Sequence, residues 1–161
     1  MRAVATLTLA CVSLLITDLA HAAKPRHDRV ERSIIGAVNQ QRVAHGLAKV
    51  HRSAKLARAA DFHSWEMLDA NYFAHSSRNG ASFSSRVRRF ARHRALGETL
   101  AWTSGCGRHS AGHVVQMWMN SPGHRAVLLS PRYRRIGVGR RTGHLGSTRA
   151  CVITADFGSR R

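Results

Sequence analysis

The chain is poor in acidic, aromatic and sulfur-containing residues. Its 161 residues include 8 Asp and Glu against 26 Lys and Arg, which gives a formal net charge of +18 with histidine neutral. Aromatic residues make up 6%, and no recognition-module pattern interleaves them with the arginines, so we expect no sequence-specific nucleic-acid partner. The 3 cysteines lack the spacing of a metal site built from thiolates.

Long hydrophobic runs are also missing after the first residues. Arg2 precedes an apolar run from Ala3 to Ile16, and Ala20-His21-Ala22 follows as a small-x-small cleavage pattern. We therefore predict a signal peptide over residues 1–22 and export to the periplasm, cell envelope or medium. An uncleaved N-terminal anchor is the alternative. Residues 23–29 are short, polar and basic and predict a disordered leader, which leaves 30–161 for a single domain.

Motifs of common enzyme classes are absent too. The sequence has no phosphate-cradling glycine loop, no nucleophile elbow and no internal repeat. Apolar spacing instead predicts a helix from about Val30 that ends before Gly46, and a second helix capped by Ser53 that ends near Asn71. Ser82 is predicted to cap a third helix containing Phe83, Val87 and Phe90.

The second half begins with helices and ends in strands. Val114, Val115, Met117 and Trp118 suit a short buried helix, and Ser121-Pro122 starts another with His124 in its first turn. Residues 136–138 and 152–157 read as two strands joined by a turn at Thr142 to Ser147. The fold class predicted is α+β, with helices in front and strands at the tail.

Cysteine usage is consistent with export. Cys11 lies inside the predicted signal, so Cys106 and Cys151 remain in the mature chain. An even number in an exported protein predicts one disulfide between them, worth about 4 kcal/mol in the chain-entropy model. Two buried free thiols are the alternative.

The positive charge is nearly all arginine, and lysine occurs only at Lys24, Lys49 and Lys55. Such a surface attracts polyanions in a salt-dependent way, so we expect anionic envelope lipids or polymers as electrostatic partners. The arginines at Arg86, Arg88, Arg89 and Arg92 are interpreted as the solvated face of the third helix.

A few polar residues stand in positions that favour chemistry. His63 lies on an apolar helix face, where a satisfied core histidine is the commoner explanation. His75 follows a helix end among aromatics, and the first turn that holds His124 disfavours its imidazolium form. Glu98 is a lone carboxylate beside an apolar run and needs a partner, for which an arginine would serve.

These segments together resemble the bacterial branch of the CAP superfamily, also called the SCP domain. The resemblance spans about residues 30–158. Its motifs are Asn39-x-x-Arg42-x-x-x-Gly46-Leu47, Tyr72-Phe73-x-His75-x-Ser77, Gly97-Glu98-Thr99-Leu100-Ala101-Trp102, Met117-Trp118-x-Asn120-Ser121-Pro122-Gly123-His124-Arg125, Ile136-Gly137-Val138-Gly139 and Asp156-Phe157-Gly158.

The resemblance implies an α-β-α sandwich with a small central sheet flanked by helices. It also implies a cleft formed by His75, His124 and Glu98, which would suit zinc or another divalent cation in an open site. Two positions depart from the pattern, since Ser121 stands where many eukaryotic members have a second glutamate, and Thr99 stands for the usual asparagine.

Three functions follow as hypotheses. The first is a secreted binding module whose cleft holds a divalent metal or a small apolar or lipid ligand, with a basic surface for envelope material. The second is a metal-assisted hydrolase with Glu98 as base beside His75 and His124. The third is a structural triad in which Glu98 ties the two imidazoles to the sheet. The missing second carboxylate places the binding module first and the enzyme last.

Overall fold

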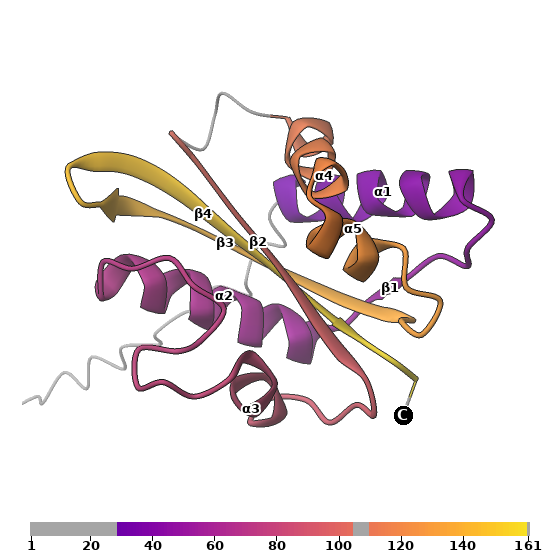
Figure 1. Cartoon of the computed structure of the whole chain (residues 1–161), viewed down its shortest axis with the longest axis horizontal. Coiled ribbons are helices and arrows are strands. Elements are labelled where there is room, and N and C mark those ends of the chain that lie inside the picture. Colours follow the sequence, from indigo (N-terminus) through magenta and orange to yellow (C-terminus); the bar gives the residue numbers. More distant parts are fainter. Residues whose placement is uncertain (1–28, 105–109, 161) are drawn as a thin grey trace, which may run out of the picture.

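The computed structural model describes residues 29–104 and 110–160 as three layers, a four-stranded sheet between two groups of helices (Figure 1). The helices α1, α4 and α5 cover one face of the sheet, and α2 and α3 cover the other. The elements are α1 (Arg29–Ala44), β1 (His51–Arg52), α2 (Ala54–Asp69), α3 (Phe83–Arg88), β2 (Leu96–Ser104), α4 (Ala111–Asn120), α5 (Pro122–Leu128), β3 (Arg135–Leu145) and β4 (Thr148–Gly158). The expected α-β-α sandwich is confirmed.

The helix ends lie where the capping residues place them. Gly46 has a φ of +70°, and Gly46 N and Leu47 N donate to Val43 O and Arg42 O, which closes α1 in a Schellman motif. The Ser53 hydroxyl accepts from Leu56 N and caps α2. Ser121 occupies the N-cap position of α5, but its side chain makes no capping hydrogen bond.

The strand order is β1-β3-β4-β2, with β1 parallel to β3 and the other pairs antiparallel. The expectation of helices first and strands last was incomplete, because β1 and β2 both precede the helices α4 and α5 in the chain. Its mixed apolar and polar sequence hides the strand, since both of its faces are covered. The β3–β4 hairpin is also longer than predicted, and its turn is only residues 146–147.

Two sequence interpretations were wrong, one about burial and one about the length of a helix. Met117 is 38% exposed, because α4 turns only one side toward the core. Phe90 lies beyond the end of α3, which is a helix of 6 residues. By contrast, Trp118 is buried at the centre of the core beneath α1 and α4, together with Ile34, Val38, Leu128, Ile136 and Phe157.

Buried polar side chains of α1 bind the backbone of the loops that connect helices and strands. Arg42 is fully buried and donates to four backbone carbonyls, those of Ala48, Leu128, Ser130 and Tyr133. Asn39 exchanges two hydrogen bonds with the backbone of Val50, at 3.0 and 2.8 Å. Both residues belong to the first motif of the resemblance, so their roles are structural.

Two glycines of β3 let α2 approach the sheet. A Cβ at Gly137 would overlap the backbone of Leu56 and Ala57, and one at Gly139 would overlap that of Ala60 and Asp61. We predict that Gly139→Ala destabilises the protein by about 3 kcal/mol, because helix backbone must move to make room. Gly36→Ala is the control. It lies in α1 with open space around its Cβ position, so it should stabilise by about 0.5–1 kcal/mol. Urea unfolding measures both, and an unchanged Gly139→Ala midpoint would contradict the close contact.

Candidate functional site

The candidate site lies at the free edge of β2. The sheet brings together His75 from the segment between α2 and α3, His124 from the first turn of α5, and Glu98 from β2 itself. The centroids of the His75 and His124 rings are 6.0 Å apart. His75 Nδ1 donates to Glu98 Oε1 at 2.8 Å. The structure therefore places the three residues together, as the resemblance implied.

Arg86 is the centre of this cluster. Its side chain is 1% exposed and pairs with Glu98 Oε2, so the partner expected for the buried carboxylate is an arginine. Arg86 Nη1 also donates to His75 O and Ser77 Oγ, each at 3.0 Å. The interpretation of Arg86 as part of a solvated face was wrong, whereas Arg88, Arg89 and Arg92 are exposed. One buried cation thus fastens the His75 segment to the sheet.

A second network shapes the same segment. Glu66 in α2 accepts hydrogen bonds from Tyr72 Oη at 2.8 Å, His63 Nδ1 at 3.1 Å and Arg78 N at 3.3 Å. His63 is fully buried, and its Nε2 contacts Ala74 O at 2.9 Å. The expected satisfied core histidine is confirmed. Its role is to hold the segment that presents His75, whose side chain is 51% exposed.

The α4–α5 corner positions His124 from the other side of β2. Trp118 Nε1 donates to Leu100 O at 2.9 Å, so α4 is anchored to the edge strand. Burial, and then the neighbouring His75, lower the pKa of His124. The pKa is shifted in the expected direction, but the causes are burial and the neighbouring His75 rather than the helix terminus.

A second carboxyl group was not anticipated. Asp156 lies opposite Glu98 on β4, is fully buried, and both of its oxygens have no hydrogen-bond partner among the described residues. Burial, and then the charge of Glu98, raise the pKa of Asp156 well above its ordinary value. Glu98 is therefore not a lone carboxylate. An acidic residue inside an apolar strand, in a chain with so few acids, was the signal in the sequence.

The two departures from the family pattern have different consequences. Thr99 is buried with its hydroxyl unpartnered among the described residues, and as the neighbour of Glu98 along a strand it points to the opposite face. It does not contribute to the cleft. Ser121 leaves the α4–α5 corner without the second glutamate of other members.

Residues 29–104 and 110–160 contain no group of three or more His, Cys, Asp or Glu arranged to hold a metal ion. Both oxygens of Glu98 are engaged by protein donors, one by Arg86 and the other by His75. The metal-ligating role of His75, His124 and Glu98 stays a prediction.

Other sequence predictions fall outside the described residues. These are the signal peptide over 1–22, residues 23–28 of the leader predicted over 23–29, and Cys106. The last residue of the predicted leader, Arg29, is instead the first residue of α1. Ser104, the last residue of β2, pairs with Ala150 beside buried Cys151, and the disulfide stays a prediction. No helix among the described residues has the length and hydrophobicity to cross a membrane.

The raised pKa of Asp156 gives a pH-dependent prediction. A carboxyl group whose pKa is raised by folding supports stability below its unfolded pKa and loses that contribution as pH rises. Asp156→Asn should therefore gain in melting temperature relative to the wild type as pH rises from 5 to 8. Asp69→Asn, at an exposed position, is the control and should show no such trend. If the difference in melting temperature between Asp156→Asn and the wild type did not change with pH, the raised pKa of Asp156 would be contradicted.

Comparison with known proteins identifies the same architecture. The sequence matches the CAP family, described as the cysteine-rich secretory protein family, over residues 35–155. It is 33% identical over 124 residues to the uncharacterised protein YkwD of Bacillus subtilis, covering 76% of this chain and 47% of that protein. It is 36% identical over 110 residues to the uncharacterised membrane protein YlbC of the same organism, covering 68% and 31%. The chain thus spans less than half the length of these relatives.

Solved structures agree. An extracellular SCP-domain protein of Bacillus anthracis superimposes with a TM-score of 0.67 at 29% identity, over 81% of this chain and 40% of that chain. An outer surface protein of Borrelia burgdorferi gives a TM-score of 0.72 at 18% identity, over 84% and 96%, and supports the fold alone. The family match and the shared fold lead to one conclusion: the chain belongs to the CAP, or cysteine-rich secretory protein, family.

Proposed function

We propose that the protein is an exported binding module whose two imidazoles, His75 and His124, hold a divalent cation such as zinc at the edge of β2. The observation that carries the proposal is the adjacent pair of rings, with centroids 6.0 Å apart and planes tilted by 57°, one of them oriented by a buried carboxylate. Export is supported by the N-terminal sequence and by the similarity to an extracellular SCP-domain protein of Bacillus anthracis.

The donor chemistry fits a metal with Glu98 in an orienting role. Because His75 Nδ1 gives its hydrogen to Glu98, Nε2 of the same ring keeps a lone pair for a ligand. A carboxylate that fixes the tautomer of a ligating histidine is the usual second contact in zinc sites. The lowered pKa of His124 favours the neutral form that a metal requires. The protein would supply two ligands and solvent the rest.

Burial of Glu98 favours binding over hydrolysis. A general base must reach the water or proton it acts on. The Glu98 side chain is 1% exposed, and both oxygens already accept from protein donors. A small apolar ligand remains the alternative occupant of the cleft, since Phe73 and Trp102, which flank His75 and Glu98 in sequence, are 41% and 42% exposed.

The structural role of Glu98 is a second candidate, and the buried ion pair favours it. A charge left without its partner in the interior is costly, so we predict that Glu98→Gln destabilises by about 3–5 kcal/mol in urea unfolding. The control is Asp61→Asn, which breaks the exposed pair with Arg141 and should cost at most about 1 kcal/mol. A neutral or stabilising Glu98→Gln would contradict the structural role.

Zinc titration by calorimetry tests the cleft directly. We expect residues 23–161 to bind one zinc per chain in a saturable way, and the double variant His75→Ala/His124→Ala to lose that site because both ligands are gone. The control is His51→Ala/His144→Ala, which removes two exposed histidines elsewhere and should bind as the wild type does. Circular dichroism confirms that each variant is folded. Equal binding by both double variants, or none by the wild type, would contradict the metal proposal.

A further inference from the structure

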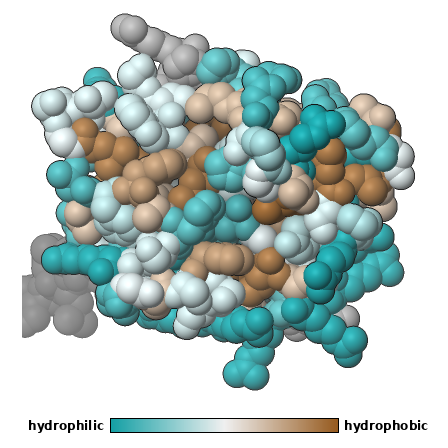
Figure 2. All heavy atoms as spheres, in the orientation of Figure 1, coloured by the Kyte–Doolittle hydropathy of each residue, from teal (hydrophilic) through white to brown (hydrophobic). Residues whose placement is uncertain are grey.

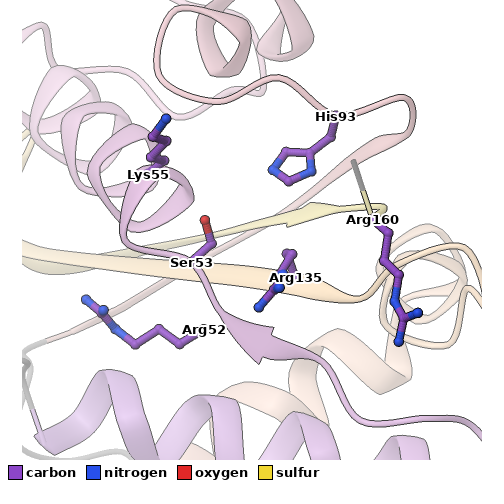
Figure 3. Close-up of a pocket in the computed structure, with 6 residues that line it drawn as sticks. All are labelled: Arg52, Ser53, Lys55, His93, Arg135 and Arg160. Atoms are coloured by element: carbon purple, nitrogen blue, oxygen red, sulfur yellow. The ribbon is translucent and has the colours of Figure 1, made fainter.

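Three cavities have basic walls that include neither His75 nor His124. Two lie where β3 begins and β4 ends, and the third lies between the start of α2 and the residues around the end of α3. Hydrophilic groups project along the lower edge of the view in Figure 2, beside α3 and the C-terminal end of β4 in Figure 1. The first cavity has a volume of about 580 Å³ (Figure 3). Its walls are Arg52, Ser53, Lys55, His93, Arg135 and Arg160.

The first cavity is assembled from five segments of the chain. They are β1, the start of α2, the segment before β2, the start of β3 and the residues after β4. His93 is a buried wall whose Nδ1 donates to Ser159 O at 2.7 Å, and Ser159 N donates to Ala95 O at 3.0 Å. These bonds fix the backbone just before Arg160. The cavity is thus a product of the fold and not of one flexible loop.

The other two cavities, of about 510 Å³ each, share walls with the first. One shares Arg160 and adds Arg94, Arg132 and Arg134. The other shares Lys55 and adds Arg88, Arg89 and Arg92. We call the ten cationic side chains of these three cavities the basic track. Each neighbour shares a cation with the first cavity, so both adjoin it.

The described walls of the three cavities carry many positive charges and no acidic side chain. The head groups of Lys55, Arg135 and Arg160 make no hydrogen bond or ion pair with any described residue. Like charges gathered in concave walls repel one another and raise the local concentration of anions. The track is therefore suited to an anionic ligand.

We propose that the basic track binds a linear phosphodiester polymer, with successive phosphates in successive cavities. Nine of its ten cations are arginine, whose planar fork matches two oxygens of a phosphate. Three adjoining cavities fit a polymer with repeated charges better than they fit a single small anion. The inference rests on the export and the anionic partner expected of the protein, and it does not depend on the cleft.

A membrane surface fits the track less well. Lipid binding at an interface adds the burial of apolar side chains to electrostatic attraction. The large exposed apolar residues of the described chain are Val43, Trp65, Phe73, Trp102 and Met117, and none of them lines the track. Half-buried Phe90 is the one Phe, Tyr or Trp among the described lining residues, so the track also lacks a row of stacking platforms for bases.

Two charge-matched variants test the proposal. Lys55→Gln/Arg135→Gln/Arg160→Gln removes three track cations, and Arg32→Gln/Arg78→Gln/Arg149→Gln removes three from elsewhere on the surface. The probe is a linear glycerol-phosphate oligomer, titrated with chelator present so that no metal occupies the cleft. Affinity is measured at several salt concentrations by fluorescence anisotropy of the labelled oligomer, and circular dichroism verifies that both variants are folded.

The track variant should lose affinity by about tenfold or more, and its slope of log affinity against log salt should flatten by about 2, because three phosphate contacts are lost. The control variant should stay within about threefold of the wild type. Equal losses in the two variants would mean diffuse attraction by net charge and would overturn the proposal. The proposal would also be overturned if the track variant lost binding to anionic phospholipid vesicles but kept its binding to the oligomer. Because the oligomer titration contains no free zinc, a negative result would overturn the basic-track proposal without affecting the metal proposal. A negative zinc titration would likewise leave the basic-track proposal unaffected.

Discussion

The ion pair between Arg86 and Glu98 is the interaction on which the candidate site depends. Both side chains are 1% exposed, so each charge would be costly without the other. The pair crosses from α3 to the edge strand β2, and Nη1 of Arg86 also donates to the backbone oxygen of His75 and to the hydroxyl of Ser77. The other oxygen of Glu98 sets the orientation of the His75 ring. A buried charge pair thus determines where an exposed imidazole lies.

The edge position of β2 explains why two layers can contribute to one candidate site. A central strand would separate His75, which belongs to the α2 and α3 side, from His124, which belongs to the α1, α4 and α5 side. At the edge, the two segments lie on either side of a strand that has no further strand beyond it among the described residues. The centroids of the His75 and His124 rings are therefore only 6.0 Å apart. The glycines Gly137 and Gly139 act on the same arrangement, because they let α2 lie close to the sheet and so set the depth of the His75 segment.

The helices, their caps and the layered fold could be predicted because they depend on local spacing and on motifs that stand together in sequence. Gly46 and Ser53 are examples. The strand β2 could not, because a strand covered on both faces lacks the alternation that marks a half-buried one. Arg86 was misassigned for a related reason. It shares a helix with exposed arginines, and only the position of Glu98, twelve residues later, shows that it is buried.

The distribution of charge separates the two proposed ligands. Three of the six acidic residues in the described chain, Glu66, Glu98 and Asp156, lie in or behind the cleft. The charge of Glu98 is paired with that of Arg86, and burial raises the pKa of Asp156 above its ordinary value. The positive potential of the basic track extends beyond its own cavities mainly at low salt, since the screening length is about 8 Å at physiological ionic strength. A cation in the cleft and a polyanion on the track can therefore occupy the same small domain.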